Sequence, residues 1–132
     1  MDVINCNILI VDDSAVTRAA IKRTLCLAGM SLSSIFEAGN GHAALEVLEN
    51  VRVDLVLADL HMPEMDGVEM TSRILANDAT KDIPVMVVSA EPSAQRLEQL
   101  KQSGVRGYIR KPFTPEQIRR GIADILQPTT MV

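Results

Sequence analysis

Four short apolar runs of this chain each lead into a reactive side chain. They are strand-like and occupy residues 8–11, 55–58, 85–88 and 108–109. The residues that follow them are Asp12 and Asp13, Asp59, Ser89 and, after Arg110, Lys111. In a parallel sheet such ends lie side by side, at the edge where α/β folds place their sites. The pattern therefore predicts that three carboxylates, a hydroxyl and an ammonium group meet in one cleft.

Strand-like and helix-like patterns alternate along the whole chain. Strands are predicted at residues 7–11, 34–38, 54–58 and 106–109, with another that opens at Pro84. Helices are predicted between the strands. The first runs from the cap Ser14 to Gly29, the second covers 43–49 after a turn at 39–41, and the third contains Met70 and Ile74. The fourth covers 93–102 before Gly104, and the last runs from the capping box at 114–117 through Ile118, Ile122 and Ile125. Five strands alternating with five helices predict a doubly wound, five-stranded parallel sheet of the α/β class.

Size and composition fit one domain that builds its core from aliphatic residues. The 132 residues are 47% hydrophobic but only 2% aromatic, and we expect a core at about 6–126 with a loose tail at 127–132. No apolar run approaches the roughly 20 residues that cross a bilayer. Cys6 and Cys26 match no metal-ligand spacing, which favours reduced thiols in a cytoplasmic protein. The net charge of −4 argues against a general nucleic-acid binder.

The acidic pair at the end of the first strand predicts a metal site. Two like charges about 4 Å apart repel each other by roughly 4 kcal/mol at an effective dielectric constant near 20. Asp12 and Asp13 next to Asp59 therefore need a compensating charge, and Mg²⁺ is a hard cation that takes one or two carboxylates as ligands. The simpler interpretation is that one aspartate of the pair caps the first helix and the other faces solvent, but Asp59 at the end of another central strand argues against it.

Asp59 is the predicted nucleophile, because a carboxylate can attack a phosphoryl group and hold it as an acyl phosphate. A metal ion on one side and Lys111 on the other would neutralise the oxygens of the transferring group. Ser89 offers a hydroxyl that can donate a hydrogen bond to that group. Pro112 holds Lys111 extended and out of the following helix, in a cis or a trans bond that the sequence leaves open.

These residues resemble the receiver domain of two-component response regulators over about residues 6–126. The resemblance rests on Asp12 and Asp13, on Asp59, on Ser89 with Ala90, and on two further motifs: the loop of Met62, Pro63, Glu64, Met65, Asp66 and Gly67, and the run of Lys111, Pro112 and Phe113. It implies the flavodoxin-like strand order 2-1-3-4-5, the order of the chemotaxis receiver CheY.

The resemblance also implies a role for each residue. Asp59 would accept a phosphoryl group from a histidine kinase, a phosphotransfer protein or a small phosphodonor. Mg²⁺ would be bound by Asp13, Asp59 and the backbone carbonyl of His61, and by Asp12 through a water molecule. Lys111 and Ser89 would contact the phosphoryl group, and Tyr108 would turn inward as Ser89 moves. The downstream protein target would bind the face formed by the fourth helix, the fifth strand and the fifth helix.

Two positions depart from the commonest family pattern. Ser89 stands where threonine is frequent, so the hydroxyl is kept and a methyl group is lost. His61, two residues after the nucleophile, is an uncommon side chain there. A solvent-exposed ring is the simpler interpretation, and the alternative hypothesis is that His61 and Glu91 border the phosphoryl group and set its lifetime. Unchanged dephosphorylation rates in His61→Ala and Glu91→Ala would exclude that hypothesis.

Two other classes of protein share parts of this pattern. A flavin or nucleotide binder would cradle phosphate with glycine-rich loops, whereas here the first loop is acidic and no G-x-x-x-x-G-K-[ST] motif is present. A phosphatase with an aspartyl nucleophile would place a second acid two residues after Asp59, where this chain has His61. The sequence favours a phosphorylated signalling domain over an enzyme that turns over external substrates.

Charge and length lead to two further expectations. Residues 1–90 hold 13 acidic and 6 basic side chains, whereas residues 91–132 hold 4 and 7. An acidic partner is the hypothesis that follows, against the simpler interpretation of a mildly basic, solvated surface. We also expect a stand-alone regulator, the alternative being a receiver excised from a longer regulator or hybrid kinase. The basic side chains that suggest an acidic partner fall on the elements of the expected signalling face: Arg96, Lys101, Arg106, Arg110, Arg119 and Arg120.

Overall fold

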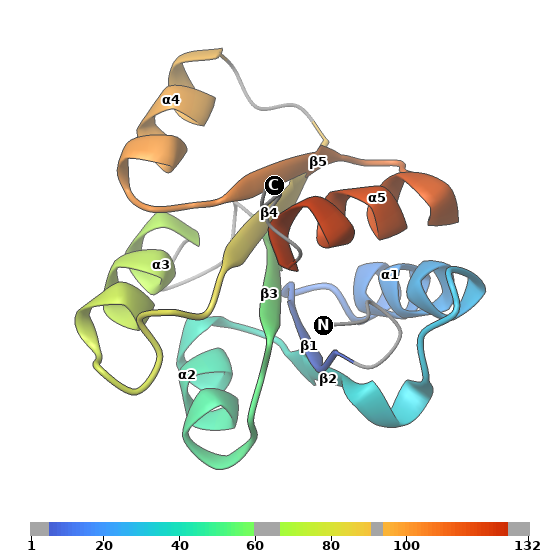
Figure 1. Cartoon of the computed structure of the whole chain (residues 1–132), viewed down its shortest axis with the longest axis horizontal. Helices are drawn as coiled ribbons and strands as arrows, with labels where there is room; N and C mark the ends of the chain where they lie inside the picture. Colours follow the sequence, from blue (N-terminus) through green and yellow to red (C-terminus); the bar gives the residue numbers. More distant parts are fainter. Residues whose placement is uncertain (1–5, 60–66, 91–93, 127–132) are drawn as a thin grey trace, which may run out of the picture.

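The chain forms one five-stranded parallel sheet with helices on both faces (Figure 1). This computed structural model describes residues 6–59, 67–90 and 94–126. The strand order is β2-β1-β3-β4-β5, which confirms the predicted fold class and the order that the family resemblance implied. The strands are β1 (Ile8–Val11), β2 (Ile35–Ala38), β3 (Leu55–Asp59), β4 (Val85–Ser89) and β5 (Gly107–Arg110).

Helices α1 and α5 cover one face of the sheet, and α2, α3 and α4 cover the other (Figure 1). Their packing follows the alternation of side chains along the strands. On β1, Ile8 and Ile10 pack towards α1 and α5, whereas Leu9 and Val11 pack towards α2 and α3. The helices are α1 (Ala15–Leu27), α2 (Gly41–Asn50), α3 (Gly67–Ala76), α4 (Ala94–Gln102) and α5 (Pro115–Leu126), with a short 3-10 turn, η2 (Leu32–Ser34), before β2.

The central strands β1, β3 and β4 are apolar along nearly their whole length because both faces of the sheet are covered. Asp59 and Ser89 are the exceptions, and each is the last residue of its strand. Met70 and Ile74 on α3, and Ile118 and Ile122 on α5, are fully buried as their helical spacing predicts. The apolar strands thus build the core, and their polar ends face one edge of the sheet.

The predicted helix caps are present, with one difference at the second helix. Ser14 accepts a hydrogen bond from the Thr17 N–H, and the capping box at the start of α5 makes both of its reciprocal bonds. The predicted turn at 39–41 is wrong in part, because α2 begins at Gly41, two residues earlier than expected. Asn40 causes the difference, since its side chain accepts the N–H of Ala43 and acts as the N-cap.

The predictions about the loop after Asp59 and about the C-terminal tail concern residues that the structure does not describe. The loop at 60–66, with His61 and most of the family motif, and the tail at 127–132 lie outside the described residues. Among the helices that are described, none has the length and apolar character needed to cross a membrane.

Candidate functional site

The ends of four parallel strands meet at one edge, as the sequence predicts. Val11 on β1 is in register with Ala58 on β3, so Asp12 follows directly beside Asp59. Asp59 pairs in turn with Val88 on β4, and Ser89 pairs with Arg110 on β5. This register brings to one edge residues that are up to 99 positions apart in the sequence.

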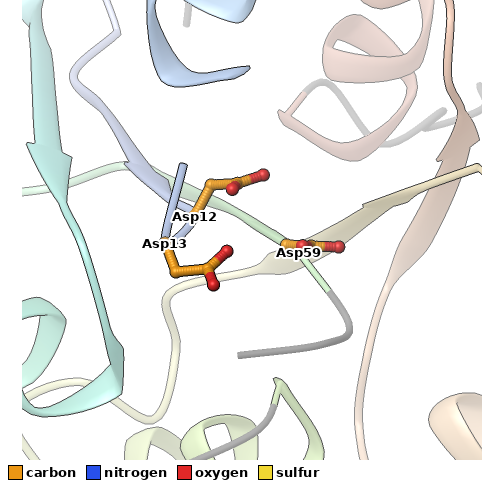
Figure 2. Close-up of side chains that lie close together, drawn as sticks. All are labelled: Asp12, Asp13 and Asp59. Atoms are coloured by element: carbon orange, nitrogen blue, oxygen red, sulfur yellow. The ribbon is translucent and has the colours of Figure 1, made fainter. Parts of the chain in front are cut away.

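Three carboxylates converge at this edge (Figure 2). Asp12, Asp13 and Asp59 each offer an oxygen, and these atoms all lie within 4.8 Å of one another. Asp12 is 2% exposed and Asp59 is partly buried, whereas Asp13 faces solvent. A set of oxygen donors on partly buried carboxylates is the chemistry that a hard divalent cation prefers. The cluster could therefore hold such an ion.

Asp12 is held by a hydrogen bond at each of its polar groups. Its Oδ1 accepts the N–H of Ser14 at 2.9 Å, and its Oδ2 accepts from Lys111 Nζ at 3.2 Å. Its own N–H donates to the Ala38 carbonyl at 3.1 Å, and its carbonyl accepts from the Arg18 guanidinium at 2.6 Å. Asp12 therefore has a fixed orientation, whereas the neighbouring Asp13 carboxylate is exposed to the solvent and accessible to an ion.

Lys111 supplies the cation of the site. Its Nζ lies 3.2 Å from Asp12 Oδ2 and 4.0 Å from Asp59 Oδ1, and its side chain is 25% exposed. Its backbone N–H donates to the Ser89 carbonyl at 2.9 Å, and the Lys111–Pro112 peptide bond is cis. One ammonium group thus partly offsets the charge of two carboxylates. Its ion pair with Asp12 was not predicted from the sequence.

Ser89 and Tyr108 lie on the two strands at the β5 side of the site. Ser89 is buried at the end of β4, one residue beyond the Val88 that pairs with Asp59. Tyr108 on β5 is half-buried, and its hydroxyl donates to the Ser89 backbone carbonyl at 3.2 Å. The two residues are thereby connected in this structure through the backbone of Ser89.

The structure therefore brings Asp12, Asp13, Asp59 and Lys111 together and places Ser89 at the same edge. His61 and Glu91 are outside the described residues, so the predictions about them stay predictions. Arg18 is a contact residue that sequence reasoning missed. The sequence carries little signal for it, because an arginine in the first turns of a surface helix is usually solvated.

The sequence matches one protein family over most of its length. Residues 8–123 match the model of the response regulator receiver domain family. The chain is 33% identical over 123 residues to chemotaxis protein CheY-3 of Vibrio cholerae, covering 93% of both chains. It is 34% identical over 120 residues to a chemotaxis protein CheY homolog of Campylobacter jejuni, covering 90% of this chain and 91% of that one.

Solved structures give the same likeness in three dimensions. CheY4 of Vibrio cholerae superimposes with a TM-score of 0.83 at 29% identity, over 92% of this chain and 98% of that one. The receiver domain of the sensor histidine kinase PA1611 of Pseudomonas aeruginosa, solved with a magnesium ion coordinated in its active site cleft, gives a TM-score of 0.80 at 26% identity, over 92% and 97%. The chain belongs to the family of response regulator receiver domains and is a CheY-like receiver of two-component signalling.

Proposed function

We propose that this receiver is switched by phosphorylation of Asp59, with a histidine kinase or a phosphotransfer protein as the phosphodonor. The observation that carries the proposal is the position of the Asp59 carboxylate. It lies beside two further carboxylates and 4.0 Å from the Lys111 ammonium. Receiver domains are signalling domains, and the chemistry of this one would be the gain and loss of its own phosphoryl group.

The proposed step is a transfer between a histidine nitrogen and a carboxylate oxygen. An Asp59 oxygen forms a bond to phosphorus while the P–N bond of the donor phosphohistidine breaks, and the leaving imidazole nitrogen takes up a proton. The Lys111 ammonium is close enough to Asp59 to pair with an oxygen of the incoming phosphoryl group, and the Ser89 hydroxyl would donate a hydrogen bond to another. Water later attacks the acyl phosphate, which restores the carboxylate and releases inorganic phosphate.

Mg²⁺ fits the donor set at this edge. Asp13 and Asp59 would bind it directly together with the His61 backbone carbonyl, and Asp12 would bind it through a water molecule. The exposed position of Asp13 and the four hydrogen bonds of Asp12 support that division of roles. The ion would supply positive charge for the oxygens of the transferring group. The magnesium ion in the PA1611 receiver domain supports the choice of metal.

The proposed output is a change in the face formed by α4, β5 and α5. Ser89 would move towards the phosphoryl group, and Tyr108 would exchange its hydrogen bond to the Ser89 carbonyl for an inward position. A downstream protein would read that change. Exposed cations lie on this face or at its border, and they favour an acidic partner: Lys101, Arg106, Arg110, Arg119 and Arg120.

Salt provides the test of the acidic partner. Charges at the rim of an interface act mainly on the association rate and on its salt dependence. Arg119→Glu should therefore slow association with the target and flatten its dependence on salt. Binding that is indifferent to both salt and Arg119→Glu would contradict an acidic partner.

We further propose that the chain is a single receiver domain that acts alone in the cytoplasm. Its coverage of 93% of CheY-3 supports this, whereas the PA1611 receiver domain represents the alternative of a receiver within a kinase. Further in-frame codons after Val132 in the source gene would contradict the stand-alone proposal.

The phosphoryl chemistry can be tested by the stability of the label. Acetyl phosphate with Mg²⁺ should label the protein, and chelation of the metal should prevent labelling. The label should be released by hydroxylamine, which cleaves acyl phosphates and leaves serine phosphate esters intact. A label that resists hydroxylamine, or that forms equally well without a divalent cation, would contradict the proposal.

A further inference from the structure

Arg18 joins the acidic loop to the neighbouring strand β2. It lies in the first turns of α1, and its backbone N–H donates to the Ser14 carbonyl at 2.9 Å. Its Nη1 donates to the Asp12 backbone carbonyl at 2.6 Å, and its Nε donates to Glu37 Oε1 at 3.1 Å. The side chain as a whole is 19% exposed, although α1 is a surface helix.

Glu37 holds the guanidinium in that position. Its second oxygen, Oε2, pairs with Lys22 Nζ at 2.5 Å, so one carboxylate connects two cations of α1. The hydrogen bond from Lys22, followed by that from Arg18, lowers the pKa of the Glu37 carboxyl. Glu37 is itself fixed by the sheet, where it pairs with Ile10 of β1. The planar fork of arginine can bind a carboxylate and a carbonyl at the same time, which a lysine ammonium cannot match in geometry.

The Asp12 carbonyl is a point from which Asp13 can be oriented. A carbonyl group lies in the rigid plane of the peptide that joins its residue to the next one. Fixing the Asp12 oxygen therefore fixes the Asp13 nitrogen and restricts the direction of the Asp13 side chain. The peptide on the other side of Asp13 is held by the hydrogen bond from the Ser14 N–H to Asp12 Oδ1, so the contact of Arg18 is the side-chain support on the Asp12 side of this exposed residue.

We propose that Arg18 is a positioning residue for the metal site and acts through the Asp12–Asp13 peptide. This role rests on the function proposed above. It holds the Asp12 carbonyl from one side while Glu37 and Lys22 hold its guanidinium from the other. The Asp13 carboxylate is thereby oriented for Mg²⁺ before the ion arrives. Preorganisation of this kind raises affinity because less backbone freedom is lost on binding.

Electrostatics alone predicts the opposite change in Mg²⁺ affinity when Arg18 is replaced. A guanidinium near an acidic cluster repels a divalent cation, so the loss of its charge should tighten Mg²⁺ binding. The loss of its hydrogen bond to the Asp12 carbonyl should weaken Mg²⁺ binding. The direction of the change in Arg18→Ala therefore separates the two effects, and Arg18→Lys separates them again because it keeps the charge and loses the fork.

The experiment is a calorimetric titration of each full-length variant with Mg²⁺, without a phosphodonor. Residues that support metal ligands typically change affinity by about 10- to 100-fold, and Arg18 acts through only one carbonyl, so Arg18→Ala should raise the Mg²⁺ Kd about 3- to 10-fold. Arg18→Lys should raise it by a smaller factor. Arg23→Met is the matched control, because Arg23 is an exposed cation of the same helix α1 and is not among the residues that hold the Arg18 guanidinium. Its Kd should stay within about twofold of wild type.

A second readout separates positioning from a general loss of stability. The Mg²⁺ concentration that half-saturates labelling by acetyl phosphate should rise in Arg18→Ala, whereas the labelling rate at saturating Mg²⁺ should stay within twofold of wild type. If Arg18→Ala does not fold, Arg18→Lys decides the question with the same two measurements. An unchanged or lower Kd in the folded Arg18 variant would contradict the positioning role. A wild type that binds no Mg²⁺ would contradict the proposed function, and with it this role.

Discussion

Lys111 Nζ donates a hydrogen bond of 3.2 Å to Asp12 Oδ2, across 99 positions of the sequence. The same ammonium lies 4.0 Å from Asp59 Oδ1, so it has one carboxylate as a partner and a second within reach. In the proposed function Lys111 leaves Asp12 for the phosphoryl group on Asp59. The pair with Asp12 is then the position of this ammonium before phosphorylation, and Asp59 Oδ1 is 4.0 Å from that position.

The first prediction concerns the loss of that ammonium. Lys111→Met should slow labelling by acetyl phosphate about 100-fold, because removing a preorganised charge from a transferring group typically costs this much. Mg²⁺ binding should be kept or tightened, because a cation next to the site has been removed. Lys101→Met, on the exposed surface of α4, is the matched control. Weaker Mg²⁺ binding in Lys111→Met would contradict this division of roles.

The second prediction concerns the repulsion among the three carboxylates. Without divalent cations, Asp13→Asn should raise Tm by roughly 2–5 °C, since it removes one of three like charges within 4.8 Å of one another. Millimolar Mg²⁺ should raise the Tm of wild type and should have much less effect on the variant. Differential scanning calorimetry with and without Mg²⁺ measures both changes. A variant that is less stable than wild type without Mg²⁺ would show that the cluster is not under electrostatic strain.

The third prediction concerns pH and the carboxylate that supports Arg18. Hydrogen bonds from Lys22 and Arg18 lower the pKa of Glu37 from its ordinary value of 4.5. A carboxyl with a lowered pKa contributes stability that is complete above the ordinary value and is lost as the pH falls through the lowered one. Glu37→Gln should therefore be less stable than wild type at pH 7, and the difference should shrink below pH 4.5. Chemical denaturation at several pH values measures this, and a difference that grows on acidification would contradict it.

The fourth prediction concerns the turn between α4 and β5. Gly104 has a φ of +102°, and a Cβ at this position would overlap the Leu75 side chain of α3. Gly104→Ala should lower the free energy of unfolding by about 2 kcal/mol, from backbone strain of roughly 1–2 kcal/mol and from the displacement of Leu75. Gly39→Ala is the control, because its Cβ would meet the nearest atom at an ordinary 3.5 Å. Equal stability of the two variants would show that Leu75 adapts without cost.

Local signals in the sequence predicted the succession of strands and helices along the chain and the edge of the sheet that carries the site. The spatial order of the strands came from the resemblance to the receiver family. Apolar runs that end in Asp59 or Ser89 identify a covered strand and its polar end without any tertiary information. Capping residues identified the starts of α1 and α5, although Asn40 was missed as a cap because Gly41 behind it is typical of a turn. Local signals are strongest where a single residue decides the geometry.

The contacts that orient the site could not be predicted in the same way. The bond from Arg18 to the Asp12 carbonyl depends on how α1 packs against β1, and the pair of Lys111 with Asp12 depends on where the residue after β5 lies along the edge of the sheet. A sequence places a cation near an acidic edge, but the choice among Asp12, Asp13 and Asp59 as its partner is made by distances between elements. That choice determines which carboxylate is accessible to a metal ion.

The most direct test of the central claim is the intact mass of the protein after incubation with acetyl phosphate and Mg²⁺. Wild type should gain the mass of one phosphoryl group, and Asp59→Asn should gain none, because an amide oxygen is too weak a nucleophile to form the acyl phosphate. Asp13→Asn should be labelled more slowly than wild type and should recover at higher Mg²⁺. An Asp59→Asn variant that is labelled at the wild-type rate would show that the phosphoryl group is carried by another residue.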